Sequence, residues 1–177
     1  RTALDLGQRS GHAAAVAYGS VVLARIEAAR GELAAAEQLV EQARGLRGRS
    51  MPAWVTPYIV QEQVHLALVR GDEQAAQRAL DESGVAVAAP TNHAREVVHL
   101  AHLHLLLYRL AGQLAASRLG TVGGELATTT LGLAARVAAS AEAGGRLGRT
   151  IEALCVRAIA LEAQGRQAAA QADLRRA

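Results

Sequence analysis

Apolar positions along the chain recur with the spacing of amphipathic helices, and these helices come in pairs joined at a glycine. The same phrase of helix, glycine and second helix occurs four times, as "LARIEAARGELAAAEQLVEQA", "HLALVRGDEQAAQRALDES", "LLLYRLAGQLAASRL" and "RAIALEAQGRQAAAQADLRRA". The turn glycines are Gly31, Gly71, Gly112 and Gly165. Because a glycine can adopt the left-handed conformation that ends a helix, the pattern predicts a repeated helical hairpin.

The second helix of each hairpin has a regular buried face. Five residues after each glycine stands a small residue, namely Ala36, Ala76, Ser117 and Ala170. Nine residues after come Val40, Leu80, Thr121 and Leu174, and twelve after come Ala43, Ser83, Gly124 and Ala177. Spacings of 5, 9 and 12 fall on one side of a helix. The small residue suits a point where two helix backbones approach closely.

The intervals between the glycines are 40, 41 and 53 residues, so the last interval contains an insertion. We place a glycine-rich insertion near 119–132, in "LGTVGGELATTTLG", and it makes the third hairpin the least regular. Thr56 followed by Pro57 looks like a helix start, and Thr91 or Asn92 offers another cap. The expected helices lie near 12–30, 32–46, 57–70, 73–83, 93–111, 113–119, 125–143, 149–164 and 167–177.

Composition supports an all-α protein with one domain over residues 1–177. Hydrophobic residues make up 51% of the chain, yet only 2% are aromatic, so burial depends on Ala, Leu and Val. All 19 basic residues are arginines, but they are scattered and the net charge is only +3, which argues against direct nucleic-acid binding. The single cysteine, Cys155, excludes an internal disulfide and is interpreted as a small buried residue.

Neither a membrane span nor a signal peptide is evident, so we expect no membrane partner and a cytoplasmic location. The chain begins "RTALDLGQRSG" and stops at "DLRRA" in mid-helix, and we therefore expect it to be a fragment of a larger protein.

The histidine-rich stretch "REVVHLAHLHLLLYRL" raises the possibility of a metal site. Two Glu-x-x-His phrases occur, at Glu62 to His65 and Glu96 to His99, and paired phrases of this kind build di-iron sites in helical bundles. His65 lies six residues before its turn glycine and His99 thirteen, an offset of roughly 10 Å along parallel helices. We therefore expect no shared metal, and the histidines should lie toward the polar side or the groove. Leu100, Leu103, Leu107 and Leu110 should form the packing stripe.

No serine lies in a nucleophile-elbow context, and no pair of carboxylates sits in a recognisable catalytic motif. The chain is therefore not expected to be an enzyme or to have catalytic, cofactor or metal residues.

Two long stretches carry a family resemblance. The segments "GHAAAVAYGSVVLARIEAARGELAAAEQLVEQAR" and "AEAGGRLGRTIEALCVRAIALEAQGRQAAAQADLRRA" resemble the superhelical, tetratricopeptide-like sensor region of LuxR-family, MalT-type ATP-dependent transcriptional regulators. In that family an "AGR-x-G-x-x-IE-x-L" phrase leads into "ALA-x-x-AQG", and here it reads "GGRLGRTIEALCVRAIALEAQG". Ser117, Thr121 and Gly124 depart from the pattern.

The resemblance implies a right-handed superhelix of stacked antiparallel hairpins with a period of about 40 residues. It also implies that the chain binds an unknown small-molecule inducer or a regulatory protein. ATP would bind a missing N-terminal domain and DNA a missing C-terminal domain, so this chain would need no cofactor of its own. An alternative is a constitutive protein-interaction scaffold with no small-molecule ligand.

In such a superhelix the first helix of each hairpin lines the concave groove. The candidate groove residues are the polar or aromatic ones on those helices: Tyr18, Arg25, Tyr58, Glu62, His65, His99 and His102. Tyrosines at these positions can also be packing residues with a wet hydroxyl, and Arg25 and Glu62 can be solvated. Trp54 is interpreted as covering a seam between repeats.

Overall fold

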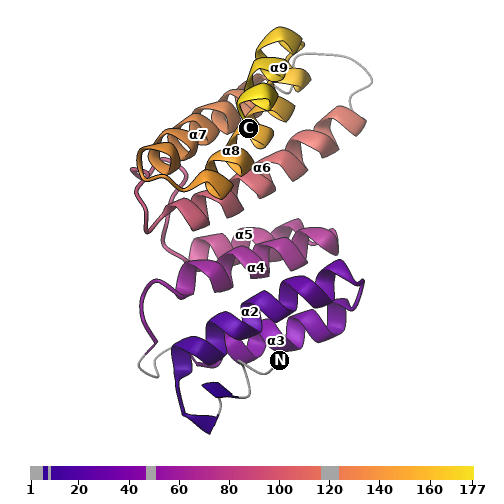
Figure 1. Ribbon diagram of the computed structural model, residues 1–177. Helices are drawn as coiled ribbons and strands as arrows, with labels where there is room; N and C mark the ends of the chain where they lie inside the picture. Colours follow the sequence, from indigo (N-terminus) through magenta and orange to yellow (C-terminus); the bar gives the residue numbers. More distant parts are fainter. Residues whose placement is uncertain (1–5, 8, 47–50, 117–123) are drawn as a thin grey trace. The chain divides into compact units, whose positions relative to one another are not determined.

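The computed structural model describes residues 6–7, 9–46, 51–116 and 124–177, and in these ranges it is all-helical (Figure 1). Its contacts divide it into two units, Arg1–Ser83 and Gly84–Ala177. Unit 1 contains α2 (Ala13–Ala29), α3 (Leu33–Arg44), α4 (Thr56–Val69) and α5 (Glu73–Glu82). Unit 2 contains α6 (Glu96–Ala116), α7 (Gly124–Ala143), α8 (Leu147–Ala163) and α9 (Gln167–Arg176). The predicted all-α fold of helical hairpins is confirmed.

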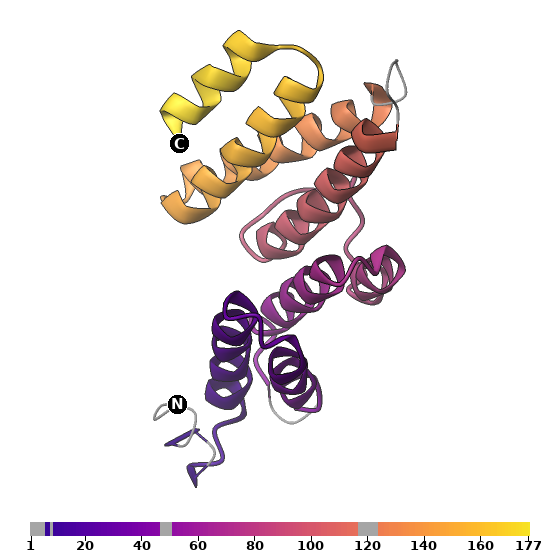
Figure 2. The ribbon, with the colours of Figure 1, turned by 90° about the vertical axis from the view of Figure 1, so that its right-hand side faces the viewer.

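Three of the four predicted glycine turns are confirmed. Gly31, Gly71 and Gly165 have φ values of 84°, 77° and 72°, and they separate α2 from α3, α4 from α5 and α8 from α9. A side chain would strain the backbone at such angles, which is why glycine is needed there. The paired helices lie side by side and antiparallel in both views (Figures 1 and 2).

The predicted turn at Gly112 is wrong. This glycine lies inside α6, which continues without a break to Ala116, so a separate helix beginning at 113 is also wrong. Alanine, glutamine and leucine follow Gly112, and these strong helix formers carry the helix past a single glycine. Ser117 and Thr121, the expected packing positions of the third hairpin, lie outside the described residues.

The predicted helix near 125–143 is confirmed as α7, which begins at Gly124 and includes Gly132, so the second half of the glycine-rich stretch near 119–132 is helical. Two threonines adapt to the helix by donating to backbone oxygens one turn earlier. Thr128 Oγ1 donates to the Gly124 carbonyl at 2.6 Å, and Thr130 Oγ1 donates to the Leu126 carbonyl at 2.8 Å. Their polar groups are thereby satisfied within the helix.

The hairpins of unit 1 pack through the predicted small residues. Ala36, Ala43 and Ala76 are completely buried, and Val40 and Leu80 are nearly so. Of these, Ala36, Val40 and Ala43 of α3 share one core with Ala17, Val21 and Ala24 of α2 and with Val55, Ile59 and Leu66 at and within α4. The Thr56 cap is shifted by one residue, since Val55 precedes the helix and Thr56 is its first residue.

Unit 2 is built around α6, α7 and α8. Leu100, Leu103 and Leu110 are buried and Leu107 packs against them, which confirms the predicted stripe of α6. The face of α9 was predicted less well. Ala170 is buried as expected, but Leu174 is 56% exposed, and Asp173 is buried in its place because it pairs with Arg157 of α8.

Candidate functional site

Five of the seven predicted groove residues belong to two helices that pack against each other in unit 1. Tyr18 and Arg25 lie on α2, and Tyr58, Glu62 and His65 lie on α4. Residues 58, 62 and 65 are spaced by four and three positions, so they lie along one side of α4. We call the surface formed by these five residues, together with Trp54, Val22 and Ile26, the α2–α4 face.

Aromatic rings gather at one end of this face. Tyr18, Trp54 and Tyr58 form what we call the aromatic cluster, with ring centroids 5.3 Å apart for the two tyrosines and 5.6 and 6.4 Å for Trp54 with Tyr18 and Tyr58. Each pair is edge to face. Tyr18 is 39% exposed and Trp54 55%, so the cluster lies at the surface. The chain has only four aromatic residues, three Tyr and one Trp, and three of them meet here.

Beside the aromatic cluster, a charged pair joins the two hairpins. Arg25 Nε donates to Glu62 Oε2 at 2.7 Å, and Arg25 Nη2 donates to the Gln61 side-chain oxygen at 2.7 Å. Glu62 is only 1% exposed, and its Oε1 has no hydrogen-bond donor among the described residues. A buried carboxylate oxygen without a donor is costly, so this position is prepared to accept a hydrogen bond or to face a cation.

Apolar side chains extend the α2–α4 face along α2. Val22 and Ile26 follow Tyr18 at intervals of four residues, and both are exposed. Three large apolar side chains in one exposed row are more than scattered surface residues, and such patches mark binding surfaces. Periodicity did not single out Val22 and Ile26, because apolar residues on a helix are assigned first to its packed side.

The structure places His99 and His102 differently from the sequence prediction. Both are buried in unit 2, with His99 completely inaccessible, beneath the segment that precedes α6. His99 Nδ1 lies 3.1 Å from Thr91 Oγ1, and His102 Nε2 lies 2.6 Å from the Val85 carbonyl oxygen. The prediction of a polar or groove-facing position is therefore wrong, because residues 84–95 cover this side of α6. Burial lowers the pKa of His99 below its ordinary value.

The glutamates of the two Glu-x-x-His phrases are both held by arginines. Glu62 binds Arg25, as described. Glu96 is completely buried and binds Arg146, Arg149 and Ser140 through four hydrogen bonds of 2.6 to 2.7 Å. Burial raises the pKa of Glu96, but the hydrogen bonds from Arg146, Ser140 and Arg149 outweigh this effect and lower it to about 2. Among the described residues there is no group of three or more His, Cys, Asp or Glu that could hold a metal.

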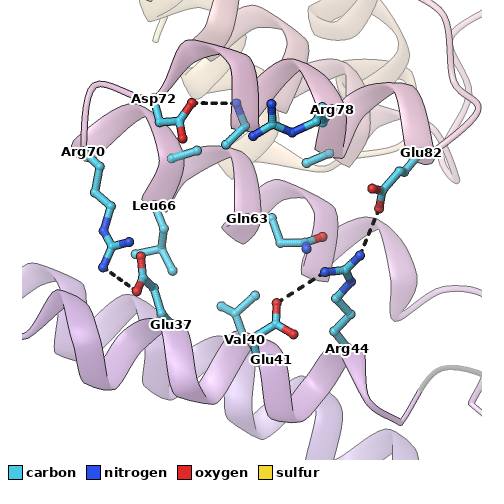
Figure 3. Close-up of a pocket in the computed structure, with 13 residues that line it drawn as sticks. Glu37, Val40, Glu41, Arg44, Gln63, Leu66, Arg70, Asp72, Arg78 and Glu82 are labelled. Atoms are coloured by element: carbon cyan, nitrogen blue, oxygen red, sulfur yellow. Dashed lines mark hydrogen bonds and ion pairs between the residues drawn. The ribbon is translucent and has the colours of Figure 1, made fainter.

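A second candidate site in unit 1 is a cleft of about 360 Å³ between α3, α4 and α5 (Figure 3). Its apolar floor includes Val40, Leu66, Ala67 and Ala79, and charged side chains surround it. Two ion pairs span it, Arg70 with Glu37 and Arg44 with Glu82 at 3.3 Å. These rim charges already pair with each other across the cleft, and the two ion pairs attach the second hairpin to α3. No motif or spacing in the sequence indicated this cleft.

The helices within the described ranges are all too short or too polar to cross a membrane.

Comparison with known proteins identifies one family. The model of the MalT-like TPR region, where TPR stands for tetratricopeptide repeat, matches residues 1–177. Neither a curated protein nor a solved structure matches the chain. The match covers the full sequence, so it includes both structural units and the hairpins that were inferred from the glycine spacing.

Proposed function

The chain belongs to the MalT-like TPR region family, and from that premise we propose that it is the signal-sensing domain of a bacterial LuxR-family, MalT-type transcriptional regulator. In this proposal it binds an inducer or a regulatory protein in the cytoplasm and passes the signal to ATPase and DNA-binding domains elsewhere in the parent protein. It performs no catalysis and carries no cofactor itself.

One observation carries the proposal. Residues from two separate hairpins converge on the α2–α4 face, where three of the chain's four aromatic side chains meet and exposed apolar residues continue along α2. The core of unit 1 is formed by small and aliphatic residues, with Tyr58 alone among the rings packed at its edge. Exposed aromatic rings that contribute little to the core are better explained by recognition than by folding.

The position of the face suggests how a signal is transmitted. A ligand that contacts Tyr18 on α2 and Tyr58 on α4 at the same time binds best at one angle between the first two hairpins. Its affinity therefore differs between arrangements of those hairpins, and this difference shifts their populations. A ligand that bound all arrangements equally would transmit nothing. Arg25, Gln61 and Glu62 connect the same two hairpins and provide polar contacts beside the rings.

The second candidate function is a constitutive protein-interaction scaffold. The exposure of Val22 and Ile26 favours it, because an open apolar row suits a partner helix or peptide as well as a small molecule. The two functions differ in whether any small molecule binds.

Thermal unfolding across a panel of sugars, amino acids, aromatic acids, nucleotides and divalent metals tests the proposal. A ligand at about a hundred times its dissociation constant adds roughly 2.7 kcal/mol of stability. That corresponds to a rise in Tm of several degrees for a chain of this size. The rise should disappear in Tyr58→Leu and persist in Tyr108→Leu, which changes the aromatic residue outside the cluster. No rise with any compound would favour the scaffold, and a rise unaffected by Tyr58→Leu would move the site elsewhere.

A further inference from the structure

The aromatic cluster contains all but one of the chain's aromatic residues, and the exception is Tyr108. Phe is absent, and the buried cores of both units consist of Ala, Val, Leu and Ile. The three rings come from three places along the chain, namely α2, the segment before α4, and α4 itself. Trp54 and Tyr18 are both exposed. Their convergence therefore points to a ligand that specifically needs several ring faces.

The angles between the rings indicate what kind of ligand this is. The ring planes meet at 60° for Tyr18 with Trp54, 86° for Tyr18 with Tyr58 and 81° for Trp54 with Tyr58. Rings at such angles present surfaces in different directions. A flat ligand stacks on parallel faces and would use only one of these rings. A compact, rounded group can contact the exposed surfaces of more than one ring.

The distances between the rings suit a cation at the cluster. The ring centroids are 5.3 to 6.4 Å apart, so a group that lies against one exposed ring also has the other rings beside it. A cation interacts favourably with an aromatic face within about 6 Å, and cages of several rings are the known means of recognising quaternary ammonium groups.

The charges beside the cluster are compatible with a cationic ligand. Arg25 is the one arginine of α2, and its guanidinium is balanced by Glu62 at 2.7 Å. Glu62 lies one helical turn after Tyr58, and its Oε1 has no donor among the described residues. The Arg25–Glu62 pair has no net charge, so it does not oppose the approach of a cation to the cluster.

We propose that the aromatic cluster of Tyr18, Trp54 and Tyr58 binds a quaternary ammonium group. This inference rests on the proposed use of the α2–α4 face for sensing, and it names the chemical class of the signal. The group can belong to a free small molecule of the choline type or to a trimethylated lysine of a partner protein. Recognition depends on the positive charge, because a cation is attracted to the ring faces and a neutral group of the same shape is not.

Trp54 allows a direct test, since it is the only tryptophan in the chain, and fluorescence excited selectively at tryptophan therefore reports on the cluster alone. The 177-residue protein is titrated with choline and, separately, with 3,3-dimethylbutan-1-ol, which has the shape of choline without its charge. Sodium chloride keeps the ionic strength constant. Saturation-transfer NMR on the N-methyl protons of choline detects binding that leaves the fluorescence unchanged. We expect saturable binding of choline and affinity for the alcohol at least about tenfold weaker.

Three variants separate the rings from the fold. Tyr18→Leu removes one ring and should weaken choline binding about tenfold, whereas Tyr18→Phe keeps the ring and should bind within a few-fold of the original protein. Tyr108→Leu is the matched control, because Tyr108 is 37% exposed, close to the 39% of Tyr18, and lies on α6 outside the cluster. It should bind choline normally. Circular dichroism shows whether each variant retains its helices.

Two results would overturn the inference. Equal binding of choline and the alcohol would mean that the cluster is an apolar pocket, and absence of choline binding by both methods would mean that it is no ammonium site. Either result leaves the proposed sensing function open, because that function fails only if no compound of any class acts through Tyr58. If choline binds, comparison with a peptide containing trimethyllysine identifies the source, since tighter binding of the peptide indicates a partner protein.

Discussion

Replacing Glu96 by Gln should destabilise the protein more than any comparable change of a surface carboxylate. Glu96 begins α6 and is completely buried. Its Oε1 accepts from Arg146 Nη2 and Ser140 Oγ, each at 2.6 Å, and its Oε2 accepts from Arg146 Nε and Arg149 Nη1, each at 2.7 Å. These bonds attach the start of α6 to the end of α7 and the start of α8. Glutamine keeps the shape of the side chain but replaces one of the two acceptor oxygens with an NH2 group, which only donates.

The expected loss follows from these contacts. Hydrogen bonds to a charged group contribute about 1.5 to 3 kcal/mol each, and breaking a buried ion pair costs about 3 to 5 kcal/mol. The Arg146 and Arg149 side chains remain 25% and 16% exposed, so water can partly solvate them after the carboxylate is lost. We therefore expect the free energy of unfolding to fall by about 3 kcal/mol, at the lower end of that range.

Urea unfolding followed by circular dichroism measures this loss. Glu37→Gln is the matched control, since Glu37 pairs with Arg70 at the surface and its removal should cost less than about 1 kcal/mol. The reasoning is refuted if Glu96→Gln changes stability no more than the control does.

The same carboxylate predicts a dependence on pH. Its pKa is about 2 in the folded protein, compared with an ordinary value of 4.5, so the folded protein binds the proton less readily than the unfolded chain. The stabilisation is complete above about 4.5 and is lost as the pH falls toward 2. A difference of 2.5 units corresponds to about 3.4 kcal/mol, which we reduce to about 2 to 3 kcal/mol because the arginines are partly exposed. The stability difference between the original protein and Glu96→Gln should shrink across this range.

Three further changes test other contacts. Burial lowers the pKa of His99, so the free energy of unfolding should fall as the pH drops below about 6.5. In urea unfolding, the free energy of His99→Leu should depend less steeply on pH, and equal slopes for the two proteins would contradict this. Asp173→Ala removes the carboxylate that accepts a hydrogen bond from Arg157 Nε at 2.6 Å. The free energy of unfolding, measured by thermal unfolding, should fall by about 2 to 3 kcal/mol. An unchanged stability would show that the pair does not hold α9 to α8. Ala76→Leu should lower the free energy of unfolding by about 1 to 3 kcal/mol, because Ala76 is completely buried and a larger side chain overpacks the core. The control Gln74→Leu, at an exposed position, should lower it by less than about 0.5 kcal/mol. Equal losses would mean that the close helix approach at Ala76 is unimportant.

Much of the fold could be predicted from glycine spacing because each confirmed turn depends on a local conformation. Gly31, Gly71 and Gly165 adopt the left-handed backbone that only glycine enters without strain. Gly112 has the same sequence context but lies within a helix. A glycine permits a turn without requiring one, so the spacing alone could not distinguish the two outcomes.

The candidate site was predictable where it depended on helix periodicity. Tyr18, Arg25, Tyr58 and Glu62 are brought together because α2 and α4 are neighbours and these residues recur at helical spacing on the sides that meet. Trp54 was expected to cover a seam between repeats, and it does lie against Tyr18 of the first hairpin and Tyr58 of the second.

Several errors concern side chains whose partners lie outside their own helix. His99 and His102 are buried because the segment 84–95 folds over α6 and supplies Thr91 and the Val85 carbonyl as partners. Glu96 is satisfied by arginines about 50 residues away. Arg146 and Arg149 belong to the "GGRLGR" motif that carried part of the family resemblance, and the structure gives this motif a physical role in fixing α6.

Hydrogen exchange tests the central claim, that the α2–α4 face is the sensing surface, most directly. Amide exchange is measured with and without the compound that gives the largest rise in Tm. We predict added protection in Ala13–Ala29 and Thr56–Val69, with little change in Leu33–Arg44 and Glu73–Glu82, because the ligand lies against α2 and α4. Protection concentrated in α3 and α5, which line the cleft of Figure 3, would contradict the account and place the site there.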